Sequence, residues 1–334
     1  MSFAELVGQQ ARVATEPNEF VISLDGGGVR CIMQLVILER LMAIFPQLLD
    51  KITLIAGTSG GSFLGLALAK GDMGLARQLF SKPNVEAIFS RTWTECLSHG
   101  WGAWRPKYDP SELERVLTEG FGNAQLSSLS KRVLITSFDL TGQVNESNPM
   151  HHNYGVQHWS PRFYDNFTTR ADQSLVEIAL RSSAAPCYFP SHAQFVDGGV
   201  VANNPSAHAV TRLVKHGASL DRIVLLSLGS SNNPFHVQPQ QSEYWGFVQW
   251  APLLLNLVMD APSEAAVVMT QELLGDRYHR CNPILPSEIA LDDTSSFEQL
   301  EQLATTCNIL PTIDFLYHHF FPDIPPIIHV SIDV

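Results

Sequence analysis

The sequence predicts an α/β protein built on a parallel β-sheet that helices cover, and three observations lead to this prediction. Short apolar runs rich in β-branched residues alternate with longer apolar stretches of helical spacing. Several short runs end in glycine-rich turns, which are typical of strands that lead directly into a helix. Material for a large core is available, because 45% of the 334 residues are hydrophobic and only 16% are charged, against about 25% in a typical globular chain.

Strands and helices alternate along the first two thirds of the chain. Runs of β-branched and other apolar residues predict buried strands at residues 20–24, 52–56, 133–138, 194–196 and 223–228. Apolar residues at helical spacing predict helices between them at residues 31–45, 62–69, 175–182 and 204–216. Asp109 and Pro110 predict one more helix start, with Asp as N-cap and Pro at the first helical position. Ligands of such sheets sit at the carboxyl ends of the strands.

Composition and charge exclude several classes of protein. Lys and Arg number 21 against 33 Asp and Glu, a formal net charge of −12, whereas a nucleic-acid-binding protein carries a basic domain or stripe. A disordered chain would hold fewer apolar and more charged residues. The five cysteines form no Cys-x-x-Cys pair, so we expect reduced thiols, with neither a disulfide framework nor a metal site.

We expect a cytoplasmic protein with one main domain. The N-terminus shows no signal peptide, and the most apolar stretch, residues 31–45, is shorter than the ~18 apolar residues of a membrane span. Residues 1–17 are expected to form an N-terminal arm, and residues 18–334 a single domain. The motifs of this domain lie within residues 20–232, while residues 235–334 are expected to be a helical extension packed on the same core.

The turn after the second predicted strand has the pattern of a nucleophile elbow, G-x-S-x-G. Residues 57–61 read Gly-Thr-Ser-Gly-Gly between a strand and a helix. Small neighbours allow the strained turn that presents the Ser59 hydroxyl, at a helix N-terminus whose dipole favours developing negative charge. Taken alone, the segment also fits a plain glycine-rich turn that binds phosphate.

The turn after the first predicted strand reads Asp-Gly-Gly-Gly-Val-Arg, at residues 25–30. Consecutive glycines let backbone N–H groups converge on an anion, so this turn predicts either an oxyanion hole or a phosphate cradle. A Walker A site is excluded because no Gly-Lys-Ser/Thr follows, and a dinucleotide site would need glycine in place of Cys31. Two glycine turns on adjacent strands, one bearing serine, favour acyl transfer.

A nucleophilic Ser59 needs a general base, and two types are available. In a Ser-His-Asp triad of this fold class the histidine follows the aspartate along the chain. The candidate histidines are His208, His216, His236 and His279, and none of them comes directly after a predicted strand. Asp197 instead ends the short strand at residues 194–196 and precedes two glycines. A carboxylate shielded from water has a raised pKa and becomes a better base, so direct action of Asp197 on Ser59 is reasonable.

Four segments, in order, resemble the patatin-like phospholipase family. Residues 25–30 look like its DGGGxR turn, and residues 57–61 look like its GTSGG elbow. Residues 181–190, Arg-Ser-Ser-Ala-Ala-Pro-Cys-Tyr-Phe-Pro, resemble the block before the base, and residues 197–205 are similar to its DGG…NNP segment. The resemblance spans about residues 20–232 and implies a three-layer α/β/α sandwich with a central, mostly parallel sheet.

The resemblance also implies a catalytic dyad of Ser59 as nucleophile and Asp197 as proton acceptor, without histidine, cofactor or metal. The oxyanion would be held by backbone N–H groups of Gly26, Gly27 and Gly28, with support from other motif residues, namely Arg30, Gly57, Gly60, Gly61, Gly198 and Gly199. Arg30 would fix the turn or meet a lipid phosphate. Cys31 departs from the family, because many members have glycine there.

Two aromatic segments have an open role. One could be an interfacial segment or a core-packed loop, and contains Trp93, Trp101 and Trp104. The other could be helix core or an acyl-chain pocket, and contains Trp245, Phe247, Trp250 and the leucines 253–255.

The expected function is hydrolysis of phospholipid acyl esters, of the phospholipase A or lysophospholipase type, through an acyl-enzyme. Alternatives are a neutral-lipid or general esterase on the same dyad, a silent storage or binding protein, and a nucleotide-binding protein. We expect no nucleic-acid partner, and an activating ligand or partner is left open. Membrane contact should be transient, peripheral and insensitive to salt, because an acidic chain is not attracted to anionic lipid.

Overall fold

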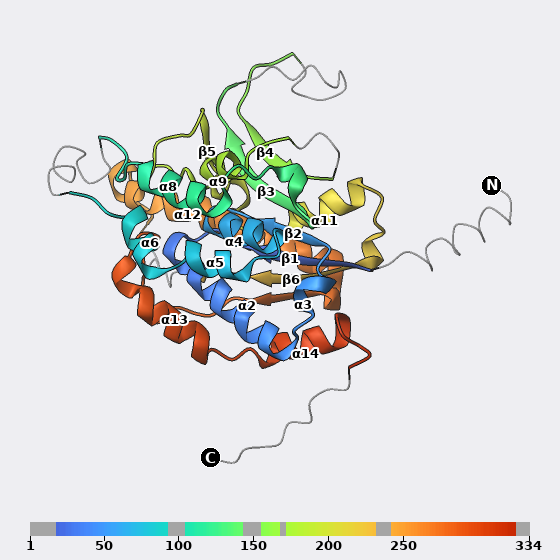
Figure 1. The fold of residues 1–334 in the computed structure, drawn as a ribbon. Helices are drawn as coiled ribbons and strands as arrows, with labels where there is room; N and C mark the ends of the chain where they lie inside the picture. Colours follow the sequence, from blue (N-terminus) through green and yellow to red (C-terminus); the bar gives the residue numbers. More distant parts are fainter. Residues whose placement is uncertain (1–17, 93–103, 143–154, 168–171, 232–241, 325–334) are drawn as a thin grey trace.

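The computed structural model describes residues 18–92, 104–142, 155–167, 172–231 and 242–324 (Figure 1). The arm expected at residues 1–17 lies outside these ranges. A seven-stranded sheet forms the centre, in the order β4-β3-β2-β1-β6-β7, with β5 paired to β3. Neighbours among β1, β2, β3, β6 and β7 run parallel, while β4 and β5 run antiparallel to β3. The predicted three-layer sandwich with a mostly parallel sheet is confirmed.

The sheet contains the five predicted strands and two others. The predicted ones are β1 (Glu19–Leu24), β2 (Leu54–Gly57), β3 (Arg132–Asp139), β5 (Phe195–Asp197) and β6 (Ile223–Leu228). The sequence analysis missed β4 (Ser160–Asp165) and β7 (Tyr278–Cys281). Both lie at sheet edges, where partial exposure admits Pro161, His279 and Arg280, so neither presents the apolar run by which buried strands are recognised.

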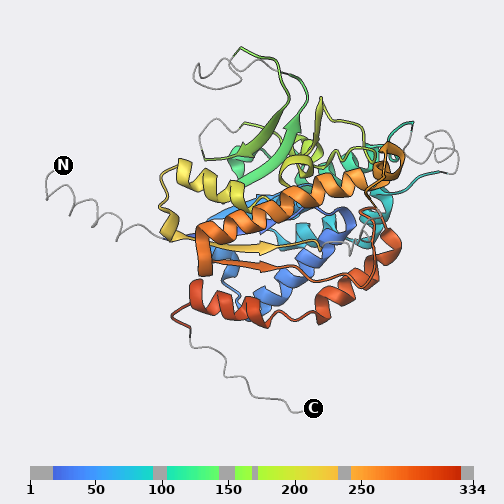
Figure 2. The same ribbon diagram turned by 180° about the vertical axis from the view of Figure 1, so that it is seen from behind.

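Helices cover both faces of the sheet (Figures 1 and 2). Alternate residues of the strands point to opposite faces: in β1, Ile22 and Leu24 pack into the larger core, and Val21 into the smaller. The larger core takes residues from α2 (Ile32–Ile44), α4 (Gly60–Ala69), α5 (Met73–Leu79), α6 (Lys82–Ile88), α8 (Ser111–Phe121), α9 (Leu175–Ser183), α13 (Phe297–Thr306) and α14 (Leu310–His319). The smaller core takes residues from α11 (Ser206–Lys215) and α12 (Phe247–Leu274).

Short helices complete the description: η1 (Gly28–Cys31), α3 (Leu48–Lys51), η3 (Leu126–Ser128), α10 (Gly199–Ala202), η4 (Leu220–Arg222), η5 (Gly275–Arg277) and η6 (Thr294–Ser296). Helix α8 begins one residue later than predicted, at Ser111, because Pro110 occupies the N-cap position. The Asp109 carboxylate still satisfies an amide of the first turn, accepting from the Ser111 N–H at 2.9 Å.

The stretch Leu253–Arg277, which takes in most of α12 and continues through η5, is long and apolar enough to cross a membrane by length and composition, with a mean hydropathy of 1.3 over an 18-residue window. One stripe of it is buried against the rest of the protein, with residues at intervals of three or four: Met259, Ser263, Ala266, Thr270 and Leu274. The other faces leave large apolar side chains exposed. The helix therefore belongs to the outer layer of the sandwich, with an apolar surface toward the solvent.

Candidate active site

Ser59 lies at a sharp turn between the end of β2 at Gly57 and the start of α4 at Gly60. Its backbone has φ 51° and ψ −127°, a left-handed conformation that non-glycine residues rarely adopt and that is a common form of strain at functional sites. The Ser59 N–H donates to Ser182 Oγ at 2.9 Å, and its carbonyl accepts from the Ser62 N–H, also at 2.9 Å. These contacts hold the strained turn that the elbow pattern predicts.

The glycines of the elbow are needed because the turn is crowded. A Cβ at Gly57 would lie 2.7 Å from Gly61 O, and one at Gly61 would lie 2.5 Å from Asp25 O. A Cβ at Gly60 would lie 2.8 Å from Cys31 Sγ. Cys31, the departure from the family pattern, is therefore buried between the two glycine turns, directly before α2.

Asp197 ends β5 and is fully buried. Its Oδ1 accepts from the Gly199 N–H at 2.6 Å. Its Oδ2 meets no donor at full hydrogen-bond geometry among the described residues, although the Ser59 hydroxyl is near enough to lower the pKa of the carboxyl. Burial outweighs both donors and raises this pKa to about 6. The carboxylate is thus a stronger base than an exposed aspartate and has one oxygen uncommitted.

Ser182, in the last turn of α9, connects the serine turn to the aspartate turn. Its Oγ accepts from the Ser59 N–H, and its carbonyl accepts from the Gly198 N–H at 3.1 Å. A Cβ at Gly198 would lie 2.0 Å from Thr136 Oγ1, and one at Gly199 would lie 2.1 Å from Met259 Cε. The sequence analysis predicted a helix that ends at Ser182 but assigned this residue no role in the site.

The three N–H groups of the triple-glycine turn differ in whether another residue accepts a hydrogen bond from them. Gly28 has φ +56°, and its carbon faces Leu291, so that a Cβ would lie 2.2 Å from Leu291 O. The Gly26 N–H donates to Asn203 O at 3.0 Å, which differs from the role expected for it. Among the described residues none accepts from the N–H groups of Gly27 or Gly28. These two remain available to an oxyanion.

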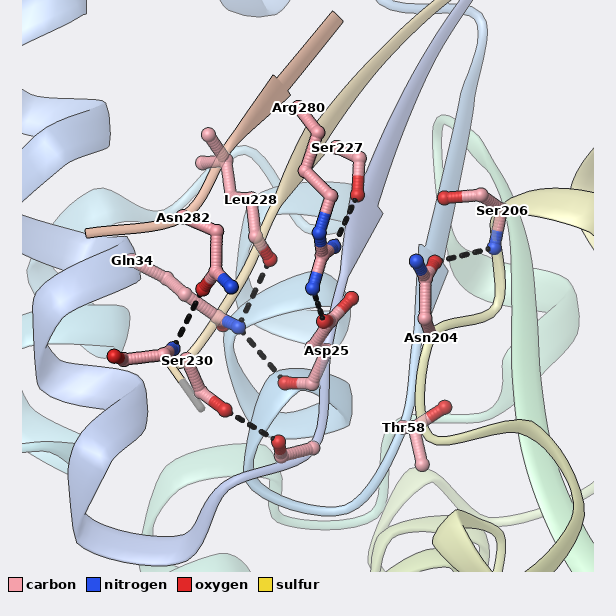
Figure 3. Close-up of polar contacts among 12 residues, drawn as sticks. Asp25, Gln34, Thr58, Asn204, Ser206, Ser227, Leu228, Ser230, Arg280 and Asn282 are labelled. Carbon is pink, nitrogen blue, oxygen red and sulfur yellow. Dashed lines mark hydrogen bonds and ion pairs between the residues drawn. The ribbon is translucent and has the colours of Figure 1, made fainter. Parts of the chain in front are cut away.

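A buried polar network holds the triple-glycine turn from behind (Figure 3). Asp25 Oδ2 and Arg280 Nη2 form an ion pair at 2.6 Å, with their side chains 3% and 11% exposed. Gln34 Nε2 donates to Asp25 O at 2.8 Å, and Ser230 Oγ donates to Gly26 O at 2.6 Å. Arg280 comes from β7, a strand that the sequence analysis missed, so its contact with the turn was not predicted.

We expect Arg280→Met to lower kcat by about tenfold with little change in KM, because the unpaired Asp25 would no longer hold the turn. It should also destabilise the fold by about 3–5 kcal/mol, the cost of breaking a buried pair. Arg280→Lys should recover part of both losses, and Arg115→Met, exposed on α8, should change neither. Steady-state kinetics and thermal unfolding test this prediction. If Arg280→Met lowers stability but leaves kcat unchanged, the ion pair stabilises the fold without affecting catalysis.

Ser59 opens onto a pocket of about 590 Å³, part of it continuous with solvent. Apolar side chains form most of its wall, from α4, α5, α6, α8 and the segment after α9: Phe63, Leu79, Phe80, Val85, Ile88, Phe89, Leu113 and Phe189. A site with one nucleophile and an apolar wall of this extent suits a long hydrocarbon chain.

The described histidines lie away from this pocket. His208 stacks on the Phe163 ring at 4.7 Å, and His279 Nε2 contacts Thr312 Oγ1 at 3.0 Å. His216 stacks on Phe167, also at 4.7 Å, and His236 lies outside the described residues. Within the described ranges no group of three or more His, Cys, Asp or Glu gathers to hold a metal ion.

The aromatic segments are more exposed than a core role requires. Trp93 and Trp101 lie outside the described residues, while Trp104 is 84% exposed. Phe247, at the start of α12, is 78% exposed, and Trp245 and Trp250 pack edge to face at 5.1 Å. Of the described residues in the two segments, neither the aromatic ones nor the leucines 253–255 line the Ser59 pocket.

Comparisons with known proteins show which family the chain resembles. Residues 22–210 match the sequence profile of the family described as patatin-like phospholipase. Over 326 residues the chain is 26% identical to Protein teg of Priestia megaterium, covering 89% of this chain and 97% of that protein. Over 275 residues it is 28% identical to the cGAMP-activated phospholipase of Pseudomonas aeruginosa, covering 78% and 77%. The structure of VipD from Legionella pneumophila aligns over 86% of this chain and 67% of that chain, with a TM-score of 0.41 and 13% identity.

Proposed function

Because this chain belongs to the patatin-like phospholipase family, we propose that it hydrolyses carboxylic esters of phospholipids, as a phospholipase A or lysophospholipase. One observation carries the proposal: Ser59, on a strained turn beside the buried Asp197 carboxylate, opens onto an apolar pocket. The pocket would take the acyl chain and place the ester carbonyl at the serine.

In the proposed reaction, Asp197 accepts the proton of the Ser59 hydroxyl while Ser59 Oγ attacks the ester carbonyl carbon. The N–H groups of Gly27 and Gly28 stabilise the negative charge on the carbonyl oxygen, and the N-terminus of α4 adds its dipole. Asp197 then protonates the leaving alcohol. A water molecule attacks the acyl-enzyme with Asp197 again as base, which releases the fatty acid and restores Ser59.

Lipid profiling tests the proposal. The purified protein is incubated with mixed phospholipids and triacylglycerols, and released fatty acids and lysolipids are measured by mass spectrometry. Fatty acid and lysophospholipid should appear from phospholipid. Release from triacylglycerol alone would instead indicate a neutral-lipid esterase on the same dyad, and no release from any lipid would indicate a silent member of the family.

The activity should depend on pH through Asp197, whose pKa burial raises to about 6. The base must be ionised to accept a proton, so kcat/KM should rise with pH, reach half its maximum near pH 6 and level off above about pH 7. Initial rates on a soluble short-chain ester, in constant-ionic-strength buffers, measure this profile. A profile that is flat from pH 5 to 8 would rule out a base with this pKa.

We further propose that the protein is cytoplasmic and meets membranes peripherally, through the start of α12. No charged residue occurs between Glu243 and Asp260. Within this stretch Tyr244 is 90% exposed, and Phe247 and Val248 are 78% and 79% exposed. An aromatic and aliphatic surface of this kind suits insertion at the boundary of a bilayer.

Phe247→Asp should weaken binding to phosphatidylcholine vesicles by more than about tenfold, since burial of one large apolar side chain contributes about 1.5–3 kcal/mol. Wild-type binding should change little between low and high salt. Val268→Asp, exposed near the other end of the same helix, is the control and should bind as wild type. Vesicle sedimentation measures all three, and equal losses in both variants would place the contact elsewhere.

A further inference from the structure

A second pocket lies beside the triple-glycine turn, next to the Ser59 pocket. Its empty space, part of it open to solvent, is about 730 Å³, and its lining includes Gly26, Arg30 and residues of α12. Tyr188 and Leu291 line both pockets, so the two adjoin. The walls differ in kind, because the second pocket is lined largely by charged and amide side chains.

Two buried polar groups face into this second pocket. Arg30 is 6% exposed, and its Nε makes only a long contact with Gly27 O, at 3.4 Å. Asn203 is also 6% exposed, and its Oδ1 has no hydrogen-bond partner among the described residues. A buried, unpartnered polar atom costs stability, which a bound ligand with a matching donor would recover.

Two carboxylates complete the lining and oppose the charge of Arg30. Asp260 on α12 is half-buried, and Glu288 is exposed at the rim. Burial lowers the pKa of Arg30, and the charge of Asp260 partly offsets this effect. Burial raises the pKa of Asp260, and the charge of Arg30 partly offsets that effect. Lys107, over the Tyr188 ring at 4.7 Å, is already paired with Asp292. Among the described residues, one cation and two carboxylates therefore line the pocket.

We propose that the second pocket binds the head group of a zwitterionic glycerophospholipid, with its phosphate against Arg30 and its ammonium against Asp260 and Glu288. This inference rests on the proposed function and names its substrate class. With the ester at Ser59 and the acyl chain in the first pocket, the glycerophosphate portion extends past Gly26 into the second. An anionic head group such as phosphoglycerol brings the same phosphate without the ammonium, and so leaves both carboxylates without a cationic partner from the ligand.

The test compares phosphatidylethanolamine and phosphatidylglycerol of identical acyl chains in neutral detergent micelles, so that vesicle surface charge does not contribute. Each initial rate is divided by the same enzyme's rate on diacylglycerol, which has no head group. The wild type should favour phosphatidylethanolamine by about tenfold or more, the ratio that corresponds to about 1.4 kcal/mol. Asp260→Asn combined with Glu288→Gln, both isosteric changes, should lower this ratio by about tenfold.

Two further arms separate the charges. Arg30→Lys should lower the normalised rate on both phospholipids, because ammonium cannot reproduce the planar fork of guanidinium on phosphate. Glu272→Gln, an exposed position on the same helix, is the matched control and should keep the wild-type ratio. As competitors, glycerophosphoethanolamine should inhibit more strongly than inorganic phosphate, since only the former offers an ammonium.

The outcomes distinguish this inference from the function on which it rests. If the wild type hydrolyses both phospholipids equally and the double variant keeps that ratio, the head-group site is wrong while the phospholipase proposal stands. Equal inhibition by inorganic phosphate would reduce the pocket to a simple anion site and overturn the zwitterion assignment. No release of fatty acid from either phospholipid would overturn both proposals.

Discussion

Ser59→Ala should abolish fatty-acid release from phospholipid, with kcat falling by roughly 10⁴–10⁶, as when the nucleophile of a serine hydrolase is removed. The strained turn carries this hydroxyl beside a carboxylate of raised pKa. A fluorophosphonate probe should label the wild type at Ser59 and leave the variant unlabelled. Mass spectrometry of the labelled peptide and lipid release by the same samples give the two measurements.

Ser183 is the matched control for the labelling. It lies in the same pocket, but its hydroxyl donates to Ala179 O at 2.8 Å and is thereby committed to the helix backbone. Ser183→Ala should therefore still be labelled at Ser59. Fatty-acid release that survives in Ser59→Ala, together with labelling elsewhere, would contradict the assignment of the nucleophile.

Asp197→Asn should lower kcat by roughly 10³–10⁴, because the amide keeps the shape of the base but accepts no proton. The same change should stabilise the protein above neutral pH. The folded-state pKa of Asp197, about 6, exceeds the ordinary value of 3.8. The stability of the wild type is therefore highest at low pH with respect to this group, and it falls as pH rises through about 6.

The size of this stability effect follows from the pKa difference. The pKa of Asp197 in the folded protein exceeds the ordinary value by about 2.2. Since one pKa unit corresponds to about 1.36 kcal/mol, ionised Asp197 lowers the free energy of unfolding by at most about 3 kcal/mol. The Asp197→Asn variant would be free of that cost, while its side-chain carbonyl could still accept from the Gly199 N–H. Thermal unfolding of both proteins at pH 4 and pH 8 measures it, with the gain expected at pH 8 only. A variant that is inactive and less stable at pH 8 would show damage to the fold rather than loss of a base.

Local sequence was sufficient to predict those parts of the site in which backbone geometry demands particular residues. The left-handed Gly28 and the crowded Gly57 and Gly61 require glycine, so the two turns are visible as motifs. The strands that carry them are buried apolar runs and were also predicted. The position of Asp197 at a strand end already suggested it as a base for Ser59, but only the resemblance selected it over the histidines, because 138 positions along the chain separate the two residues.

What the sequence could not predict depends on contacts between distant segments. The Gly26 N–H donates to Asn203 O. The residues next to Gly26 and Asn203 in the sequence do not show that these two groups meet in the fold. Arg280 sits on a polar edge strand, which has no apolar run to reveal it. The exposure of Phe247 was likewise missed, because apolar composition alone does not separate a buried helix face from one turned to a membrane.

Two contacts connect the triple-glycine turn to the C-terminal part of the chain. Asp25 pairs with Arg280, and the Val29 N–H donates to Leu291 O at 2.8 Å. The family profile ends at residue 210, yet Arg280 and Leu291, which hold the triple-glycine turn, lie 70 and 81 positions beyond that end. A chimera that joins residues 1–232 to the tail of another family member would keep the contacts of Gln34 and Ser230 with the turn but lose those of Arg280 and Leu291. Tail and turn must therefore be exchanged together, and positions 25 and 280 should change in concert among relatives.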